Sequence, residues 1–560
     1  MRSGVTGVGH QSRGWHGHPR CWGDHVPAPP REGAQEAWSS HTAANDHATL
    51  VIDALRMWAG VLAVLLAICS AAPGGAPPAL VIDPPTDALP RAAFDVHVRP
   101  AGGGEWQPLP AYFATSMSKL THAAGGAEGF VTFAFEGAPV DVRLTLPAAV
   151  KKAVVRPVLR GAPVAAVDGR TVTFRMNEPR YLVVEVNYLS NADKTTPRFT
   201  AYVLADAPDR DAPRPDAADV KLIAPGRHTP ADLAWGDKRV LCLAPGVHEV
   251  EGGKVALASG KTLYLAGGAV LKAGLVGDQV EDAAVRGRGI LDGSALPRDP
   301  GDWRSDGEQG FVFLRRGRRI TIDGPVIYNS PYWNIVAFGT ANLTIRNHKA
   351  LTWKVNNDGV QPRSVSDLLV EHCFLKCADD CIAVKTRRAA ALESRRLVFR
   401  DLVLWNDLPG NPMEIGHTSQ ADLLSDVLFE KIAVVHGESE KSHTISMAII
   451  DHSTVENVRY HDITVEGIKC ADFGLRVETS RYTSDPERGR IRGVEIRDYV
   501  SDAGPQGGKI KGFNAEHLIE NVTIRNFVTY ALDPARRHVV TDLAELKLDM
   551  AFTKGVRVEP

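Results

Sequence analysis

The chain has 560 residues, with 64 Lys or Arg against 66 Asp or Glu, so that its formal net charge at pH 7 is −2. This length is enough for two or more domains with substantial cores, and the balanced charge gives no reason to expect nucleic acid or an anionic membrane as a partner. Its 51 Gly and 36 Pro come with little sign of long amphipathic helices. An architecture built on long helices is therefore not expected.

The first 72 residues are predicted to lie outside the folded domains. Residues 1–56 carry six of the 19 His without periodicity, and we interpret them as a disordered extension or the product of a misassigned start codon. The apolar run Met57–Cys69 is too short to cross a bilayer comfortably, but it has the core and the small-residue exit of a secretory signal. We expect a signal peptide over residues 57–72, a secreted or periplasmic mature protein, and no membrane association of that mature form.

The chain has seven cysteines, which are Cys21, Cys69, Cys242, Cys373, Cys377, Cys381 and Cys470. Three of them cluster between residues 373 and 381, and their spacing makes a metal site conceivable. We favour the simpler interpretation, in which they are small apolar side chains filling a stacked β interior, with room for one disulfide. No metal and no cofactor are expected.

Residues 84–204 alternate apolar and polar side chains in short runs separated by Gly, Pro and Asp turns. The runs are Phe94–Val98, Phe130–Phe135, Val140–Leu146, Val172–Met176, Tyr181–Val186 and Phe199–Leu204. Alternation with a period of two is typical of strands with one buried face, and six or more such strands argue for an antiparallel β-sandwich. Residues 205–219, rich in Asp, Pro and Ala, are predicted to be a linker.

Residues 220–545 contain a recurring five-residue motif: apolar, any, apolar or aromatic, charged or polar, then Asp, Asn or a similar residue. It begins at Ile320, Leu343, Leu368, Leu397, Val427, Val458, Val494 and Val522, at intervals of 23 to 36 residues. Because such a unit is strand-like and cannot bury its apolar face alone, stacking predicts a right-handed parallel β-helix with coils about 4.8 Å apart. A propeller needs about 40 or more residues and four strands per blade, and fits less well.

Two short runs, Asn356-Asn357-Asp358-Gly359 and Ala378-Asp379-Asp380-Cys381, place three carboxylates on neighbouring coils. Taken alone, either run is explained by turn chemistry, since Asp, Asn and Gly tolerate left-handed backbone. An adjacent Asp pair in an apolar strand is costly, however, and like charges so close raise one pKa and prepare an acid beside a base. Hydrolysis of a glycosidic bond needs such a set, and the coil spacing allows carboxylate separations of either the inverting or the retaining kind.

These runs resemble glycoside hydrolase family 28, the polygalacturonases, with family 49, the dextranases and isopullulanase, as a close relative. Asn356-x-Asp358-Gly359 is similar to the Asn-x-Asp motif of family 28, and Asp379-Asp380-Cys381-Ile382-Ala383-Val384-Lys385 to its Asp-Asp-Cys-Ile-Ala-Ile-Lys signature. The resemblance covers roughly residues 220–530. It implies that Asp379 is the general acid and that Asp358 and Asp380 activate water in a single inverting displacement, with Asn356 holding the sugar or orienting Asp358. A sandwich before the β-helix resembles family 49 more than the simple polygalacturonases.

The next segments depart from the family 28 pattern. Asn411 falls where the family has a His, and Glu414 and His417 add polar groups that could bind sugar hydroxyls or tune the acid, although a turn histidine bonded to backbone is an equal interpretation of His417. The family's Arg-x-Lys, which grips galacturonate carboxylates, is missing: the aligned segment Ala448–His452 has no cation pair, and Asp451 in it becomes a candidate sugar ligand. A neutral or differently decorated substrate is therefore expected.

Two further residues complete the predicted site. Trp333 is a candidate for stacking on a sugar ring, or packs inside the β-helix as aromatic residues often do. Lys385 either keeps the acids charged or faces solvent. The expected function is a secreted, monomeric glycoside hydrolase that acts on a polysaccharide or oligosaccharide, with a β-helix polysaccharide lyase or a non-catalytic glycan-binding β-helix as the alternatives.

Overall fold

The computed structural model describes residues 80–116, 126–188, 195–298, 310–390 and 392–560. The predicted extension and signal peptide, with Cys21 and Cys69, lie outside these residues. Within them, none of the helices is long and apolar enough to cross a bilayer. Three short 3-10 helices are present in the described part: η2 (Val158–Arg160), η3 (Arg388–Ala390) and η4 (Leu543–Leu546).

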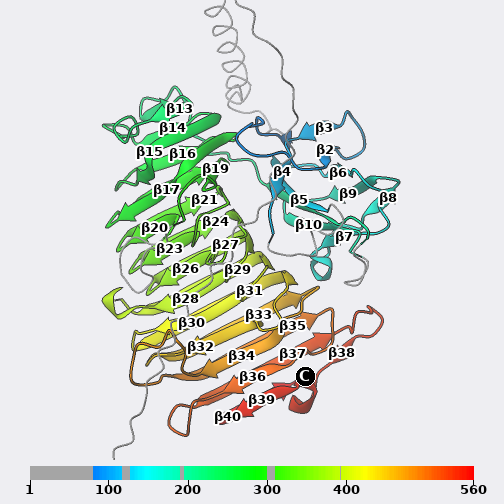
Figure 1. Cartoon of the computed structure of the whole chain (residues 1–560), viewed down its shortest axis with the longest axis vertical. Coiled ribbons are helices and arrows are strands. Elements are labelled where there is room, and N and C mark those ends of the chain that lie inside the picture. The colour runs from blue at the N-terminus through cyan, green and yellow to red at the C-terminus, as the bar shows by residue number, and fades with distance from the viewer. Residues whose placement is uncertain (1–79, 117–125, 189–194, 299–309, 391) are drawn as a thin grey trace, which may run out of the picture. The chain divides into compact units, whose positions relative to one another are not determined.

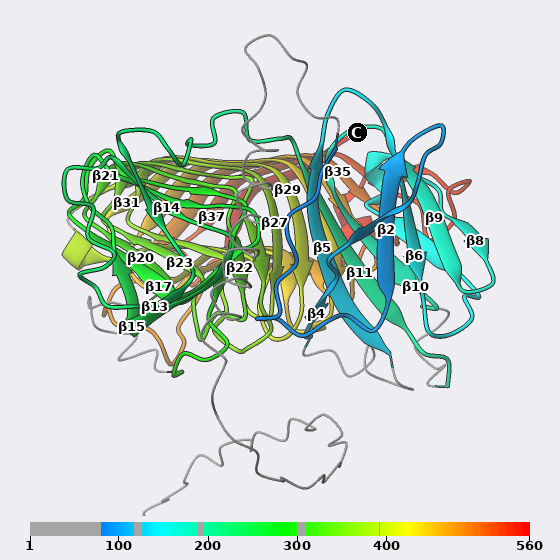
Figure 2. The ribbon, with the colours of Figure 1, turned by 90° about the horizontal axis from the view of Figure 1, so that it is seen from above.

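Two small sheets form the sandwich predicted for residues 84–204, and Figure 2 shows them as two layers. Alternate residues of each strand face the core between the sheets; in β2, for example, Val96 and Val98 are buried. One sheet consists of β1 (Leu80–Val81), β4 (Tyr112–Ala114), β5 (Ala127–Phe135), β7 (Ala153–Arg156), β10 (Tyr181–Val186) and β11 (Phe199–Asp206). The other consists of β2 (Asp95–Pro100), β3 (Gln107–Leu109), β6 (Val140–Thr145), β8 (Ala166–Asp168) and β9 (Thr171–Met176). The pairing is antiparallel except between β5 and β11, which run parallel.

Of the other 29 strands of the described residues, all but β38 form the predicted right-handed parallel β-helix, seen as a ladder of strands in Figure 1. The first row contains the repeated motif: β12 (Val220–Ile223), β14 (Val240–Leu243), β16 (Thr262–Leu265), β18 (Ala284–Gly287), β21 (Arg318–Asp323), β24 (Ala341–Arg346), β27 (Ser366–Cys377), β29 (Ser394–Asn406), β31 (Leu423–Gly437), β33 (Thr454–Val465), β35 (Arg490–Ser501), β37 (Ile519–Thr529) and β40 (Thr553–Glu559). The long first-row strands β27, β29, β31, β33, β35 and β37 continue into the second row. The separate strands of that row are β13 (Gly226–His228), β15 (Gly246–Ala256), β17 (Ala269–Asp278), β19 (Ile290–Asp292), β22 (Val326–Tyr328) and β25 (Lys349–Leu351).

The third row continues from β17 and carries the candidate site. Its strands are β20 (Val312–Arg315), β23 (Ile335–Phe338), β26 (Val360–Arg363), β28 (Ile382–Thr386), β30 (Met413–Ser419), β32 (His443–Ile449), β34 (Ala471–Val477), β36 (Gly508–Lys511) and β39 (Leu548–Ala551). Each strand pairs in register with its equivalent on the next coil, for example Ile382 with Met413 and Met413 with Ile445. Outside the three rows, β38 (His538–Val539) is antiparallel to β37.

The repeated motif marks a strand bounded by two sharp corners. Its fifth residue has a left-handed backbone in every repeat: Gly324, Asn347, His372, Asp401, Lys431, Asp462, Asp498 and Asn526. The residue before the motif is left-handed as well: Arg319, Asn342, Asp367, Arg396, Asp426, Asn457, Gly493 and Asn521. Asn, Asp and Gly adopt this conformation most readily, so they predominate at these corners and give the sequence its visible period.

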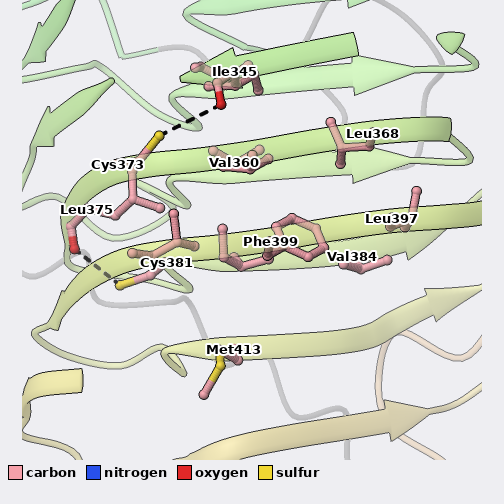
Figure 3. Close-up of a cluster of buried hydrophobic side chains, with 14 of the residues drawn as sticks. Ile345, Val360, Leu368, Cys373, Leu375, Cys381, Val384, Leu397, Phe399 and Met413 are labelled. Atoms are coloured by element: carbon pink, nitrogen blue, oxygen red, sulfur yellow. Dashed lines mark hydrogen bonds between the residues drawn. The ribbon is translucent and has the colours of Figure 1, made fainter. Parts of the chain in front are cut away.

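Apolar side chains from all three rows fill the coil interior, including Cys373, Cys377 and Cys381, as Figure 3 shows for Cys373 and Cys381. All five cysteines in the described residues are buried free thiols, so the single disulfide for which the sequence left room is not found among them. Burial raises the pKa of the Cys373 thiol to about 12 and that of Cys242 to about 11. These thiols therefore act as small apolar side chains, as predicted.

Aromatic and ionic contacts join the sandwich to the second row of the β-helix. The Tyr202 ring of β11 lies 5.5 Å from Phe374 and 5.6 Å from Trp405, measured between ring centroids. Lys376 Nζ donates to the Thr115 carbonyl at 2.7 Å and to Asp407 Oδ2 at 2.9 Å. Phe374 and Lys376 belong to β27, whose last residue, Cys377, comes two residues before Asp379. The sandwich thus braces the strand that leads into the Asp pair.

Candidate functional site

One column of residues crosses successive coils at the turns that enter the third row. Val360, Ile382, Met413 and Ile445 pair in register along that row. The residues two positions earlier are therefore equivalent to one another, and they are Asp358, Asp380, Asn411 and His443. Backbone hydrogen bonds hold the stack, since Gly359 N donates to the Asp380 carbonyl at 2.8 Å and Cys381 N to the Asn411 carbonyl at 3.0 Å.

The predicted carboxylates Asp358, Asp379 and Asp380, called the Asp trio below, come together as the coil register requires. Their nearest side-chain oxygens lie within 4.8 Å of one another. Gly410, on the following turn, makes this packing possible, because a Cβ there would lie 2.1 Å from the backbone carbon of Asp379 and 2.3 Å from Asp380 N. Cys381 and Met413, which follow these turns in the chain, belong to the apolar core (Figure 3).

Asp358 is 2% exposed, and one amide group and one ammonium group lie beside its carboxylate. Gln361 Nε2 donates to Asp358 Oδ2, and the Lys385 ammonium lies 3.5 Å from the same oxygen. Arg363 in turn donates to Gln361 Oε1 at 2.5 Å. Lys385 thus lies beside the trio, in agreement with one of its two interpretations from the sequence. Gln361 was not predicted as a site residue; the one feature of the sequence that could have indicated it is its place on β26, three residues after Asp358.

Asp379 and Asp380 have raised pKa values. Burial and the neighbouring Asp358 raise the pKa of Asp379 from 3.8 to about 6, although Asn356 N donates to its Oδ2 at 3.0 Å. Burial, Asp358 and Asp379, in that order, raise the pKa of Asp380 well above its usual value. Asp379 is half-buried and Asp380 is buried, so Asp379 is the more accessible of the pair. Electrostatics therefore keep a proton on this pair at mildly acidic pH.

Asn411 connects Asp380 to a fourth carboxylate. Its backbone N donates to Asp380 Oδ1 at 2.8 Å, and its side-chain Nδ2 lies 3.3 Å from the same oxygen and 3.1 Å from Glu414 Oε2. Glu414 is fully buried, and His417 Nδ1 lies 3.2 Å from its other oxygen. Burial alone would raise the pKa of Glu414, but His417 and Arg476 outweigh burial and hold it below its usual range.

Trp333 is not available as a sugar platform in this structure. Its side chain is 6% exposed and packs with Phe313, Val336 and Phe338. The Arg363 guanidinium covers one face of the ring at 4.7 Å from its centroid. The interior-packing interpretation of Trp333 is therefore the one that the structure follows, and the ring supports the chain of contacts from Arg363 through Gln361 to Asp358.

Asp451, predicted as a sugar ligand, is fully buried and binds backbone instead. Its carboxylate accepts hydrogen bonds from Ser419 N at 3.1 Å, Ser484 N at 2.8 Å and Asp485 N at 3.1 Å. Asp451 therefore fastens the loop between β34 and β35. That loop carries Tyr482, whose ring meets His417 edge-on at a centroid distance of 6.2 Å. Asp451 is thus one step removed from the site.

One cation, Arg476, approaches the site from a coil that the sequence analysis considered too far along the β-helix. Arg476 of β34 lies two coils beyond Gly416 in register, with the small residue Ala448 between them. Its guanidinium donates to Ser446 Oγ at 3.2 Å and contributes to lowering the pKa of Glu414. The aligned position lacks a cation pair, as predicted, but a long side chain from the next coil places one cation near the site.

The Asp trio and a second group could each be considered for a metal ion, because their ligand atoms lie within 4.8 Å of one another. The second group consists of Asp407, His436 and Glu438. In each group a lysine already neutralises a carboxylate: Lys385 lies 3.5 Å from Asp358, and Lys376 lies 2.9 Å from Asp407. Because a lysine already lies beside a carboxylate of each group, we assign a metal ion to neither group.

Comparisons with known proteins agree with this architecture. No protein-family model matches the chain. Over 231 residues the chain is 26% identical to a probable polygalacturonase of Vitis vinifera, an alignment that covers 38% of this chain and 46% of the relative. The chain thus spans about half the length of that curated relative.

One solved structure supports the fold. Dex49A from Penicillium minioluteum superposes with a TM-score of 0.59 at 14% identity, covering 87% of this chain and 97% of that one. A hyperthermoactive exopolygalacturonase from Thermotoga maritima gives a TM-score of 0.44 at 16% identity, with coverages of 57% and 84%. The predicted resemblance to the polygalacturonases is confirmed by the Vitis vinifera relative, and the predicted fold by Dex49A.

Proposed function

We propose that the chain is a secreted glycoside hydrolase that cleaves a polysaccharide or oligosaccharide at the Asp trio. One observation carries the proposal: three carboxylates converge from equivalent turns of two successive coils, and the two adjacent ones have raised pKa values. Like charges held this close, one of them next to an ammonium group, are the arrangement that separates an acid from a base. The sequence likeness to a probable polygalacturonase supports the same class of reaction.

In the proposed mechanism Asp379 protonates the glycosidic oxygen, because it is the half-buried member of the pair and burial keeps it protonated. Asp358 deprotonates the attacking water, and Asp380 helps to orient it. Lys385, 3.5 Å from Asp358 Oδ2, places a positive charge beside that carboxylate. The nearest side-chain oxygens of the trio lie within 4.8 Å of one another. Carboxyl separations of about 6.5 to 9.5 Å are typical of inverting enzymes and about 5 to 5.5 Å of retaining ones, so this spacing does not by itself favour inversion. The single inverting displacement follows from the family resemblance.

A glycan screen tests this proposal. The purified protein is incubated with pectic, α-glucan and other plant and algal glycans, and reducing ends and absorbance of unsaturated products are followed together. A hydrolase releases reducing ends without the absorbance, whereas a lyase produces both. Proton NMR of the first product then identifies its anomer: the inverted anomer supports the single displacement, and the retained anomer contradicts it. A protein that binds a glycan and cleaves none contradicts the proposal as a whole.

The rate is expected to fall as the pH rises through about 6. Asp379 must be protonated to act as the acid, and its pKa is raised from 3.8 to about 6. The value of kcat/KM should therefore be greatest in mildly acidic solution and fall about tenfold per pH unit above the apparent pKa of the Asp pair. Initial rates between pH 4 and pH 8 check this, and a profile that rises through pH 7 would contradict it.

Turnover is expected to be insensitive to chelators. Lys385 supplies the positive charge beside Asp358, so no cation is needed there. Rates measured before and after dialysis against EDTA, and again after calcium is restored, check this expectation. A loss of rate that calcium reverses, with the fold intact by circular dichroism, would show that the trio binds a cation.

A further inference from the structure

A buried carboxylate that cannot touch the substrate lies next to the proposed catalytic group. Glu414 is fully buried on β30, while its neighbour Asn411 is half-buried at the turn. An inaccessible carboxylate placed this close to an Asp trio requires an explanation, because burying a charge is costly unless it is paired and hydrogen-bonded. Its sugar-binding interpretation from the sequence does not survive this burial.

We propose that Glu414 is a positioning residue with two parts to its role. Its carboxylate holds the Asn411 side chain so that two N–H groups of Asn411 point at one oxygen of Asp380, and its negative charge acts on Asp380 across this bridge. This inference rests on the proposed function and deepens it, since it concerns the residue that would help to orient the water. Its geometric basis is the set of contacts around the Asn411 amide, in which Oδ1 makes one contact and Nδ2 makes two.

The donors and acceptors around Asn411 fix its orientation completely. Its Oδ1 accepts from His443 N at 2.8 Å, so its Nδ2 must face the two carboxylates. One N–H is then directed to Glu414 Oε2 at 3.1 Å and the other to Asp380 Oδ1 at 3.3 Å. The backbone N of Asn411 adds a third contact, to the same Asp380 oxygen at 2.8 Å. Loss of the Glu414 acceptor frees the amide to rotate away from Asp380.

The charged groups around Glu414 agree with an ionised role. His417 Nδ1 lies 3.2 Å from Glu414, and Arg476 approaches from β34; both lower its pKa. His443 is buried, and burial together with Arg476 lowers its pKa to about 4, so it is neutral near neutral pH. Tyr460, from β33 inside the coil, has its pKa raised by burial and by Glu414. Glu414 in turn contributes to the raised pKa of Asp380.

Two substitutions separate the charge of Glu414 from its hydrogen bond. Glu414→Gln keeps an acceptor for Asn411 and removes the charge, so the basic limb of the pH–rate profile should move to lower pH, and the ratio of kcat at pH 7 to kcat at pH 5 should fall by about threefold or more. Glu414→Ala removes the acceptor as well, and should lower kcat by about tenfold while KM changes by less than about threefold. If the Ala variant does not fold, the Gln variant still decides the question.

Glu478→Gln is the matched control. Glu478 follows two residues after Arg476, and their side chains are 3.4 Å apart, so the variant removes the same charge farther from Asp380. Its pH profile and kcat should match those of the wild type. The proposal is overturned if Glu414→Gln keeps the wild-type pH profile, if Glu478→Gln shifts it equally, or if Glu414→Ala raises KM at unchanged kcat, which would make Glu414 a sugar ligand.

A titration without substrate keeps this inference separate from the proposed function. The carboxyl carbon of Asp380 can be followed by NMR with selectively carbon-13-labelled aspartate, assigned by its loss in Asp380→Asn. Glu414→Gln should lower the midpoint of Asp380, and Glu478→Gln should leave it in place. If no glycan is cleaved, the proposed function fails while this midpoint still tests Glu414; an unmoved midpoint in Glu414→Gln overturns the inference even in an active enzyme.

Discussion

Asp379→Asn is expected to lower kcat by about 100-fold to 10,000-fold, the usual contribution of a positioned general acid. Asn has nearly the same shape, and it can still accept the Asn356 N–H that the structure places 3.0 Å from Asp379 Oδ2. Glycan affinity should therefore change little. The measurement is kcat on the best glycan from the screen, with affinity determined separately by calorimetry.

The same substitution should not weaken the fold. Because the pKa of Asp379 is raised from 3.8 to about 6, the native state holds this proton more tightly than the unfolded state. Stability due to this carboxyl is thus present below pH 3.8 and lost as the pH rises through about 6, so Asn should leave the melting temperature at pH 7 equal or higher. Asp237→Asn, at a side chain that is 86% exposed, is the control and should keep wild-type activity. Unchanged turnover in Asp379→Asn would remove Asp379 from the role of acid.

Lys376→Met is expected to lower the free energy of unfolding by about 3 to 5 kcal/mol, because it leaves buried carboxylates without their cation. Lys376 is fully buried, with Asp407 Oδ2 at 2.9 Å and Glu128 Oε2 at 3.9 Å, and both carboxylates are themselves fully buried. Met matches the length of the aliphatic chain, so the change tests charge more than volume. Urea and thermal unfolding, followed by circular dichroism and tryptophan fluorescence, give the size of the effect.

The control for this prediction is Lys554→Met, at an exposed position of β40, which should change stability by less than about 0.5 kcal/mol. The double variant Lys376→Met with Asp407→Asn should recover part of the loss, because one of the uncompensated charges has been removed. If Lys376→Met unfolds like Lys554→Met, the ionic contact between sandwich and β-helix does not stabilise the protein.

Much of the fold could be predicted because it is periodic. Each repeat of the motif lies between two left-handed corners, where Asn, Asp and Gly are favoured, and this turned a structural period into a sequence period at positions such as Asn347 and Asp462. The convergence of the Asp trio followed from the same period, since equivalent turns of a β-helix stack. The parallel pairing of β5 with β11 was not predicted, because alternation identifies strands and says nothing about the direction of their partners.

The incorrect predictions at the site concern side chains whose role depends on how deeply they are buried. The sequence shows that Trp333, Glu414 and Asp451 occur near the right coils, and it does not show that all three point into packed or hydrogen-bonded surroundings. Arg476 was assigned to a coil too far away because counting coils ignores the length of an arginine side chain, which reaches back past Ala448. Contacts of this kind depend on how the coils stack and on how far a side chain reaches, and neither can be read from the local sequence.

The most direct test of the central claim is a crystal structure of Asp379→Asn with an oligosaccharide that the wild-type protein cleaves. We expect the glycosidic oxygen within about 3 Å of the side chain at position 379, and a water or sugar hydroxyl between Asp358 and Asp380. An oligosaccharide bound with its cleavable bond away from these three residues would contradict the account.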